Sequence, residues 1–239
     1  MSTGGRLKLR FFAQGRLPVT YREGLQAAIY GALPPPLGPK LHDEGLLGRE
    51  RPLKLFVYSR ILGLDYVPEE KGFRASGELT LYFASALEEV VQAFGEGIWA
   101  KGGLEVHGLF LRLIGLEVEP IAPQSPVTVE ALAPITVYRT EGKRTLFFNP
   151  LNREFSLLLE ANLNRKAEAL GLEKGSLRVQ PLGFHPRRKR LERYKGTWVE
   201  GWMGCYRLEG DAHLLRLALV SGLGSKNSQG FGFVREVGG

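Results

Sequence analysis

Four histidines and one cysteine are the side chains of this sequence best suited to acid–base or nucleophilic chemistry. Histidine is the commonest general acid or base because its unperturbed pKa lies near neutrality. His107 lies in an apolar run, His213 in the first turn of a predicted helix, and His185 beside a basic run where it could contact phosphate. His42 follows a Pro- and Gly-rich loop and lies in a basic segment, so it is a candidate for catalysis. Cys205 is more typical of a small buried hydrophobe than of a nucleophile.

A glycine-rich run near the C-terminus could bind an anion. Gly222, Gly224, Gly230 and Gly232 surround a lone lysine in the segment 222–232. Glycine lets the main chain approach a ligand closely, and successive exposed N–H groups form an anion-binding concavity. Lys226, Asn227 and Ser228 are therefore candidate contacts for a polyanion such as RNA. The alternative is an ordinary turn before a terminal strand.

A second candidate for phosphate binding is a dense basic run. It comprises Arg187, Arg188, Lys189 and Arg190, followed by Arg193 and then Tyr194-Lys195. Pro186 and Gly196 bracket it between two strand patterns, which predicts a hairpin or arm. Few acids balance these cations, so the run favours phosphate binding over a merely solvated loop. Arginine forks can grip phosphates or guanine edges.

The spacing Gly-x-Gly-x5-Gly-Phe-Gly at residues 222–232 resembles the C-terminal signature of the RAMP superfamily of CRISPR-associated RNA-binding proteins. Three N-terminal segments resemble its endonuclease branch: Ala28-Ile29-Tyr30, Leu41-His42-Asp43-Glu44-Gly45 and Lys54-Leu55-Phe56-Val57-Tyr58-Ser59. The resemblance therefore extends over essentially the whole chain. Within this superfamily the chain resembles the CRISPR-associated repeat-RNA endoribonucleases, which process precursor CRISPR RNA in antiviral defence.

The resemblance implies metal-independent cleavage of CRISPR repeat RNA at one site, without a cofactor. A 2′-hydroxyl attacks the adjacent phosphate in line, leaving a 5′-hydroxyl and a 2′,3′-cyclic phosphate. His42 aligns with the family's catalytic histidine, Tyr30 with an active-site tyrosine and Lys54 with an active-site lysine. His42 can serve as base or acid, and Lys54 can stabilise charge or protonate the leaving group. Arg22, near the start of the helix that carries Tyr30, is a candidate phosphate clamp.

Three alternatives stay open. His42-Asp43 resembles the His-Asp pair of metal-dependent phosphohydrolases, although no His-x3-His or Cys-x2-Cys pattern accompanies it. A non-catalytic RAMP subunit that coats guide RNA in an interference complex would share the glycine loop and the basic surface but has no need of the candidate catalytic residues. A general RRM-like protein is disfavoured because the aromatic strand motif is absent.

The hydrophobic pattern predicts an α+β fold in which the order β-α-β-β-α-β occurs twice. The expected strands are residues 7–11, 53–62, 79–83, 104–118, 127–139, 177–184, 198–208 and 231–237. The expected helices begin near Thr20, Ser85, Asn152 and Asp211, and Glu23 lies at the capping-box distance from Thr20. The resemblance implies two ferredoxin-like (RRM-like) modules, residues 1–119 and 127–239. The proline-punctuated residues 120–126 would link them.

Charge is segregated along the chain. Residues 1–60 carry ten Lys or Arg and four Asp or Glu, and residues 178–207 carry eight and two, whereas residues 61–177 carry eleven and sixteen. Two basic blocks around an acidic middle favour a bound polyanion, here a repeat stem-loop RNA. No apolar run approaches the ~20 residues that span a bilayer. A single cysteine fits a cytoplasmic protein, and the composition is typical of a thermophile. The resemblance allows a homodimer or association with an interference complex.

Overall fold

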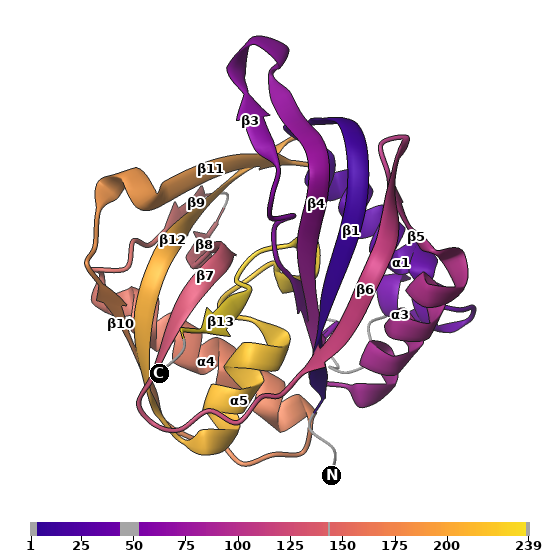
Figure 1. Cartoon of the computed structure of the whole chain (residues 1–239). Coiled ribbons are helices and arrows are strands. Elements are labelled where there is room, and N and C mark those ends of the chain that lie inside the picture. Colours follow the sequence, from indigo (N-terminus) through magenta and orange to yellow (C-terminus); the bar gives the residue numbers. More distant parts are fainter. Residues whose placement is uncertain (1–3, 44–52, 143, 238–239) are drawn as a thin grey trace.

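The computed structural model describes residues 4–43, 53–142 and 144–237, with only the backbone of residues 42 and 43. It consists of two antiparallel sheets with helices (Figure 1), which confirms the predicted α+β class. The assignment of the two halves to ferredoxin-like modules stays a prediction. No helix in the described part of the chain combines the length and apolar character needed to cross a membrane.

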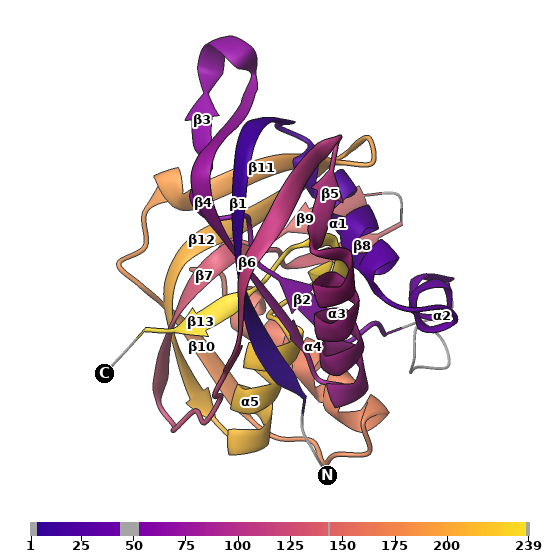
Figure 2. The same ribbon diagram turned by 45° about the vertical axis from the view of Figure 1, so that its right-hand side comes forward.

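The first half forms a six-stranded sheet in the order β2-β4-β1-β6-β5, with β3 also paired to β4. Figures 1 and 2 show α1 and α3 on the side of this sheet that faces away from the second sheet. The elements are β1 (Gly5–Pro18), α1 (Tyr21–Ala32), α2 (Leu37–Asp43), β2 (Phe56–Tyr58), β3 (Asp65–Val67), η1 (Pro68–Glu70), β4 (Gly72–Ser85), α3 (Glu88–Lys101), β5 (Gly103–Val106) and β6 (Leu109–Glu119).

The second half forms a five-stranded sheet in the order β10-β12-β7-β13, with β11 paired to β12, and a separate β8-β9 ribbon. Helices α4 and α5 lie beside each other below this sheet in Figure 1. The elements are β7 (Val127–Ile135), β8 (Tyr138–Glu141), β9 (Arg144–Phe147), α4 (Arg153–Ala169), β10 (Leu177–Leu182), η2 (Pro186–Arg188), β11 (Lys189–Tyr194), β12 (Thr197–Gly210), α5 (Ala212–Ser221), η3 (Asn227–Gln229) and β13 (Val234–Glu236).

Side-chain alternation explains the first sheet. Leu7, Leu9 and Phe11 of β1 are buried under α1 and α3, while Lys8 and Phe12 point to the other face. A strand with this period of two buries one face of a sheet and leaves the other open. The two halves keep separate hydrophobic cores, and a small cluster that includes Val57, Tyr82 and Phe233 joins them.

The predicted strand 104–118 is wrong, because the segment forms the β5–β6 hairpin. Its turn is made by His107 and Gly108, which have φ of 49° and 79°. Two consecutive residues with positive φ make the tight turn that joins antiparallel strands. His107 is therefore an exposed turn residue and not part of a strand interior.

Other boundaries also differ from the prediction. Only Phe56–Tyr58 of the predicted strand 53–62 and Val234–Glu236 of the last strand are regular strand. Thr20 occupies the N-cap position of α1 without a side-chain hydrogen bond. The expected capping box does not form, because Glu23 Oε1 accepts instead from the Lys195 backbone N–H at 2.6 Å.

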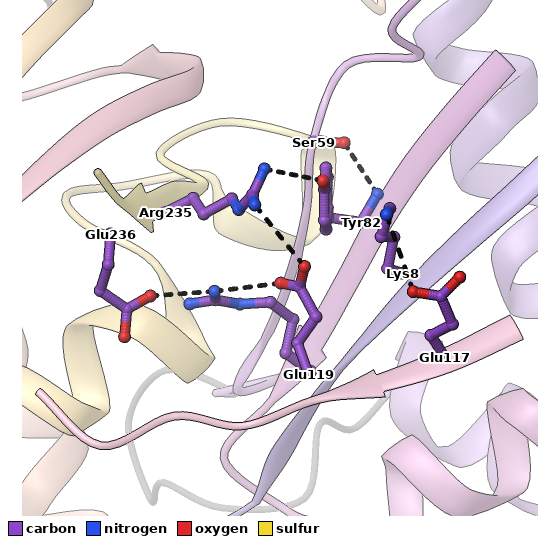
Figure 3. Close-up of polar contacts among 8 residues, drawn as sticks. Lys8, Ser59, Tyr82, Glu117, Glu119, Arg235 and Glu236 are labelled. Atoms are coloured by element: carbon purple, nitrogen blue, oxygen red, sulfur yellow. Dashed lines mark hydrogen bonds and ion pairs between the residues drawn. The ribbon is translucent and has the colours of Figure 1, made fainter. Parts of the chain in front are cut away.

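A buried charge cluster joins the two sheets at the base of the molecule. Arg6 of β1 is 1% exposed, and its Nη1 donates to Glu236 Oε2 at 3.0 Å and to Glu119 Oε2 at 3.4 Å. Figure 3 shows Arg235 of β13 directed toward Tyr82 of β4 and toward Glu119, with its Nη1 2.9 Å from the Tyr82 hydroxyl. These contacts tie the last strand, β13, to β1, β4 and β6 of the first sheet.

We expect Arg6→Met to lower the free energy of unfolding by about 3 kcal/mol, because removal of one partner leaves buried charge uncompensated. Urea denaturation followed by circular dichroism measures this. The control is Arg16→Met, whose side chain is 72% exposed in its ion pair with Glu70 and should cost less than about 1 kcal/mol. Equal effects for the two variants would contradict a stabilising role for the cluster.

Candidate functional site

Two of the three predicted catalytic residues, Tyr30 and Lys54, lie together. The Lys54 Nζ is 5.4 Å from the centroid of the Tyr30 ring, within the range of a cation–π contact. The Tyr30 ring also meets Phe56 of β2 edge-on, with centroids 5.6 Å apart. Tyr30 comes from the last turns of α1, and Lys54 precedes β2, so the packing of α1 beside β2 brings them together.

The third predicted residue, His42, lies on α2. This helix follows α1 closely, since the Gly38 backbone N–H donates to the Pro34 carbonyl at 3.2 Å. Leu41, the residue before His42, is fully buried in the first core and anchors α2. The side chain of His42 and the rest of its motif, Glu44-Gly45, lie outside the described residues, so its catalytic position stays a prediction.

The glycine-rich loop is folded tightly between the two halves of the protein. A Cβ on Gly232, which has φ of 77°, would lie 1.9 Å from the Leu223 carbonyl oxygen. A Cβ on Gly230, with φ of 84°, would lie 2.7 Å from the ring of Tyr58 in β2. Neither distance is possible for a real side chain, so at least two of these glycines are required by packing. Between Gly224 and Gly230, Lys226 adopts the left-handed conformation at φ 62°, which is uncommon outside glycine.

A buried lysine that the sequence analysis missed fastens this loop. Lys166 of α4 is 3% exposed, and its Nζ donates to the Ser221 carbonyl at 3.0 Å, the Gly222 carbonyl at 2.7 Å and Asn227 Oδ1 at 2.9 Å. The two carbonyls belong to the C-terminal end of α5, where a cation is favourable. Burial, aided by nearby Arg165, lowers the pKa of Lys166 to about 7. The three acceptors favour its protonated form, because only the ammonium has three N–H donors.

Asn227 is committed to the loop itself. Its Nδ2 donates to the carbonyls of Leu223 at 3.1 Å and Phe231 at 3.0 Å, and its Oδ1 accepts from Lys166. The amide thus spans the loop from entry to exit. The predicted RNA contact of Asn227 through its side chain does not fit this geometry, because these internal bonds occupy both the oxygen and the nitrogen.

A cavity of about 780 Å³ separates Lys54 from the glycine loop. Its lining carries five cations, and among the described residues no Asp or Glu lines it. The cations are Lys54, Arg139, Arg165, Lys166 and Lys226. Clustered cations without carboxylates create a positive potential that favours a bound polyanion.

The walls of the cavity add polar and aromatic groups from β8, α4 and the loop. The Lys226 Nζ lies 5.9 Å from the centroid of the Tyr138 ring, and Asn162 and Ser228 also line the space. Burial lowers the pKa of Lys226. Tyr138, Arg139, Asn162 and Arg165 were missed from the sequence. They are scattered through β8 and α4, where such residues are typical of a solvated surface.

A second cavity, of about 860 Å³, lies between α3 and the connection from α1 to α2. Its described lining is mostly small and apolar, with Glu96 and Lys101 as its charged residues. One acid and one base provide no net attraction for a polyanion. The cation-lined cavity beside Lys54 is therefore the stronger candidate for a functional site.

Arg22 is buried and bonded inside the protein, and its predicted contact with phosphate stays a prediction. It is 7% exposed, its Nε lies 2.9 Å from Glu192 Oε2 of β11, and its Nη1 donates to the Gly230 carbonyl. Its guanidinium also lies over the Phe231 ring, 5.2 Å from the centroid. Arg22 thus ties α1 to the basic hairpin and to the glycine loop.

Gln26, one turn further along α1, makes a parallel tie. Its Nε2 donates to the Ser228 carbonyl at 2.6 Å, and its Oε1 accepts from the Tyr194 hydroxyl of β11. Burial, together with the charge of Glu23, raises the pKa of Tyr194 to about 12, so its phenol stays protonated and can donate at neutral pH. The helix that ends with Tyr30 is thus bonded to both predicted RNA-binding segments.

The basic run forms a hairpin of η2, β11 and β12, as the bracketing Pro and Gly predicted. Lys195 and Gly196, with φ of 45° and 79°, make its two-residue turn. Arg187, Lys189 and Arg193 are exposed, and Arg188 and Arg190 are half-buried. None of the described carboxylates forms an ion pair with Arg187, Arg188, Arg190 or Arg193, so these cations are available to an external anion.

The described side chains, which exclude those of His42 and Asp43, contain no group of three or more His, Cys, Asp or Glu that could hold a metal ion. The His42-Asp43 alternative is therefore not tested by the structure, and metal-independent chemistry stays a prediction.

Comparisons with a family model and with known proteins point to the same family. Residues 117–236 match the family described as CRISPR associated protein Cas6, C-terminal. The CRISPR-associated endoribonuclease Cas6 1 of Methanocaldococcus jannaschii is 27% identical over 231 residues, covering 92% of this chain and 87% of that protein.

Two solved structures have the same fold. A CRISPR associated protein Cas6 superposes with a TM-score of 0.80 at 22% identity, covering 98% of this chain and all of the other. A RAMP protein binding different RNA substrates superposes with a TM-score of 0.81 at 19% identity and the same coverage. The match over residues 117–236 shows that this chain belongs to the Cas6 family.

Proposed function

We propose that this protein is an endoribonuclease that processes CRISPR RNA by cutting each repeat at a single site. The observation that carries the proposal is the cation-lined cavity between Lys54 and the glycine loop, with Lys54 held over the Tyr30 ring. The activity named for the Methanocaldococcus jannaschii relative supports the same function.

The proposed chemistry is a transesterification at phosphorus within the RNA. The 2′-oxygen forms a bond to the adjacent phosphorus, its proton passes to a base, and the bond to the 5′-oxygen breaks as that oxygen takes a proton from an acid. The products are a 2′,3′-cyclic phosphate and a 5′-hydroxyl. Atoms and charges balance without a metal or a protein nucleophile.

The residues have distinct tasks in this reaction. His42 serves as base, acid or both, because the unperturbed pKa of an imidazole lies near neutrality. Lys54 stabilises the negative charge that develops on the phosphorane or protonates the leaving oxygen. Tyr30 orients the Lys54 ammonium through the cation–π contact.

The cations of the cavity and hairpin hold the RNA around the cut. Arg139, Arg165 and Lys226 line the cavity and would neutralise the phosphates next to the cut in this proposal. Arg187, Arg190 and Arg193 of the hairpin grip the backbone of a short stem, because the deep major groove of an A-form helix hides its base edges. The two predicted modules, a homodimer and association with an interference complex remain compatible with this arrangement.

The decisive experiment uses an end-labelled CRISPR repeat RNA in excess EDTA, beside the same RNA with a 2′-deoxy substitution at the cleaved nucleotide. We expect one clean cut that the deoxy substitution blocks, because the 2′-hydroxyl is the nucleophile. Tight binding without cleavage, with or without added Mg²⁺ or Mn²⁺, would instead indicate the non-catalytic RNA-coating subunit. Cleavage only after addition of metal would indicate a metal site at His42-Asp43.

The matched variant for this assay is His42→Ala. It should abolish cleavage while RNA affinity survives, since the imidazole moves protons and is not needed to hold the RNA. Cleavage by His42→Ala at the wild-type rate would show that another residue carries the acid–base chemistry.

The hairpin cations should control the salt dependence of RNA binding. Each phosphate contact contributes roughly 0.7 to 0.9 to the slope of log K against log salt, so Arg187→Gln with Arg190→Gln should reduce the slope by about 1.5. Filter binding of the deoxy-substituted RNA at several salt concentrations measures it. The charge-matched control replaces the exposed cations Lys101 and Arg112 of the first half with Gln. An unchanged slope in the hairpin variant would show that this hairpin does not touch phosphate.

Arg22 should affect the rate of cleavage more than RNA binding. Arg22→Met removes the ties to Glu192 and the Gly230 carbonyl but keeps an apolar stem over Phe231. Because small misplacements of reacting groups can lower rates by up to about 100-fold, we expect the single-turnover rate at saturating enzyme to fall roughly 10- to 100-fold. The Kd for RNA should stay within about twofold, since the guanidinium is buried.

Two measurements separate positioning by Arg22 from a simple loss of fold. A thermal unfolding curve identifies the temperature at which the variant is still folded, and Arg16→Met serves as a surface control. A weaker Kd with a reduced salt slope would show that Arg22 contacts phosphate after all.

A further inference from the structure

An exposed tryptophan stands on the outer face of the basic hairpin. Trp198 of β12 is 57% exposed. Trp202, four residues further along the same strand, is 6% exposed and packs against Phe184 with ring centroids 5.3 Å apart. No aromatic ring of the described residues stacks on Trp198. The exposed part of its indole is thus accessible to a planar ligand.

The neighbours of Trp198 are basic and apolar. It pairs directly with Arg193 in the antiparallel register of β11 and β12, so the two side chains share one face of the ribbon. Lys189 and Leu191 are exposed at alternate positions of β11 and lie on that face too. The face therefore combines a large ring with cations.

Among the described residues, the acids of the hairpin leave Arg193 as the unpaired cation of this face, because Glu200 pairs with Lys189 and Glu192 lies on the other face. Glu192 points inward to Arg22, with Oε2 2.9 Å from its Nε, and Glu200 Oε2 lies 2.6 Å from Lys189 Nζ. Arg193 has no carboxylate partner in the part of the chain that the structure describes. An anion beside Trp198 would therefore meet a cation without first displacing an ion pair.

The hairpin holds Trp198 on a fixed strand. On the inner face, Tyr194 and Val199 pack against Phe231 of the glycine loop. At the turn, the Lys195 backbone N–H donates to Glu23 Oε1 at 2.6 Å. A large ring with only two side-chain torsions on a rigid strand loses little conformational freedom when a ligand stacks on it.

We propose that Trp198 is a nucleobase-stacking site, on which an unpaired base of the RNA lies while the adjacent phosphate contacts Arg193. The identity of the ligand as RNA rests on the proposed function. The base must be unpaired, because bases within an A-form helix cover one another and expose no face to a side chain. Stacking is tolerant of sequence, since every base has a π-face.

Equilibrium binding of the deoxy-substituted repeat RNA tests the site, because this RNA is not consumed. Trp198→Ala should weaken the Kd by about 5- to 150-fold, the effect of losing one stacked base. Trp198→Phe should retain most of the affinity. The matched control is Trp99→Ala: Trp99 is 71% exposed on α3, in the other half of the protein, and its loss should leave the Kd unchanged.

Tryptophan fluorescence gives a readout that does not depend on activity. The RNA should quench part of the wild-type emission, and Trp198→Phe should remove that part while Trp99→Phe does not. Wild-type affinity of Trp198→Ala, or quenching that survives Trp198→Phe, would overturn the proposal. Equal quenching by a blunt duplex without unpaired nucleotides would also overturn the proposal. Absence of quenching by any RNA would overturn it too, and would indicate that the exposed indole contacts a protein partner instead.

The failure of this site and of the proposed function are distinguishable. Normal cleavage by the wild-type protein, with no effect of Trp198→Ala on RNA binding, would contradict the stacking site but not the proposed function. Absence of cleavage together with Trp198-dependent binding of RNA would contradict the proposed nuclease function and support the stacking site.

Discussion

The rest of the structure depends on the bonds that hold the glycine-rich loop between the two halves of the chain. Lys166 supplies the buried charge, and three acceptors from α5 and the loop surround its ammonium. Asn227 then links the entry and the exit of the loop. Because glycines permit backbone contacts that a Cβ would forbid, the loop can touch Tyr58 in the first half and Thr136 in the second. The position of this loop sets one wall of the cation-lined cavity.

Cations in this protein divide into two classes by their partners. Arg6, Arg22 and Lys166 are buried, and each meets carboxylates or carbonyls from distant parts of the chain. Buried charge is tolerated only when it is paired in this way, so these residues connect elements rather than bind ligands. The hairpin arginines and the cavity residues Arg139 and Arg165 lack carboxylate partners among the described residues. Their positive charge remains available for the phosphates of RNA.

Helix α1 connects the basic hairpin and the glycine-rich loop to the pair of Tyr30 and Lys54. Its first turns are bonded through Arg22 and Gln26 to the hairpin and the loop, and its last turns carry Tyr30 beside Lys54. A rigid helix transmits the placement of one end to the other, so the elements that we propose to grip RNA and the residues that we propose to act on it share one support. A site assembled from α1, β2, β8, α4 and the loop also explains why no compact motif in the sequence describes it.

The sequence alone determined the α+β class, the family and the two basic segments, because periodicity and glycine spacing are local properties of the chain. It also brought Tyr30 and Lys54 into one hypothesis, by resemblance to the family. Only the tertiary structure decided that Arg22 and Asn227 point inward, that His107 lies in the turn of a hairpin, and that Lys166 and Arg165 line the cavity beside Lys54. Burial and partners depend on which distant segments meet, and charge or amide type at one position does not encode that.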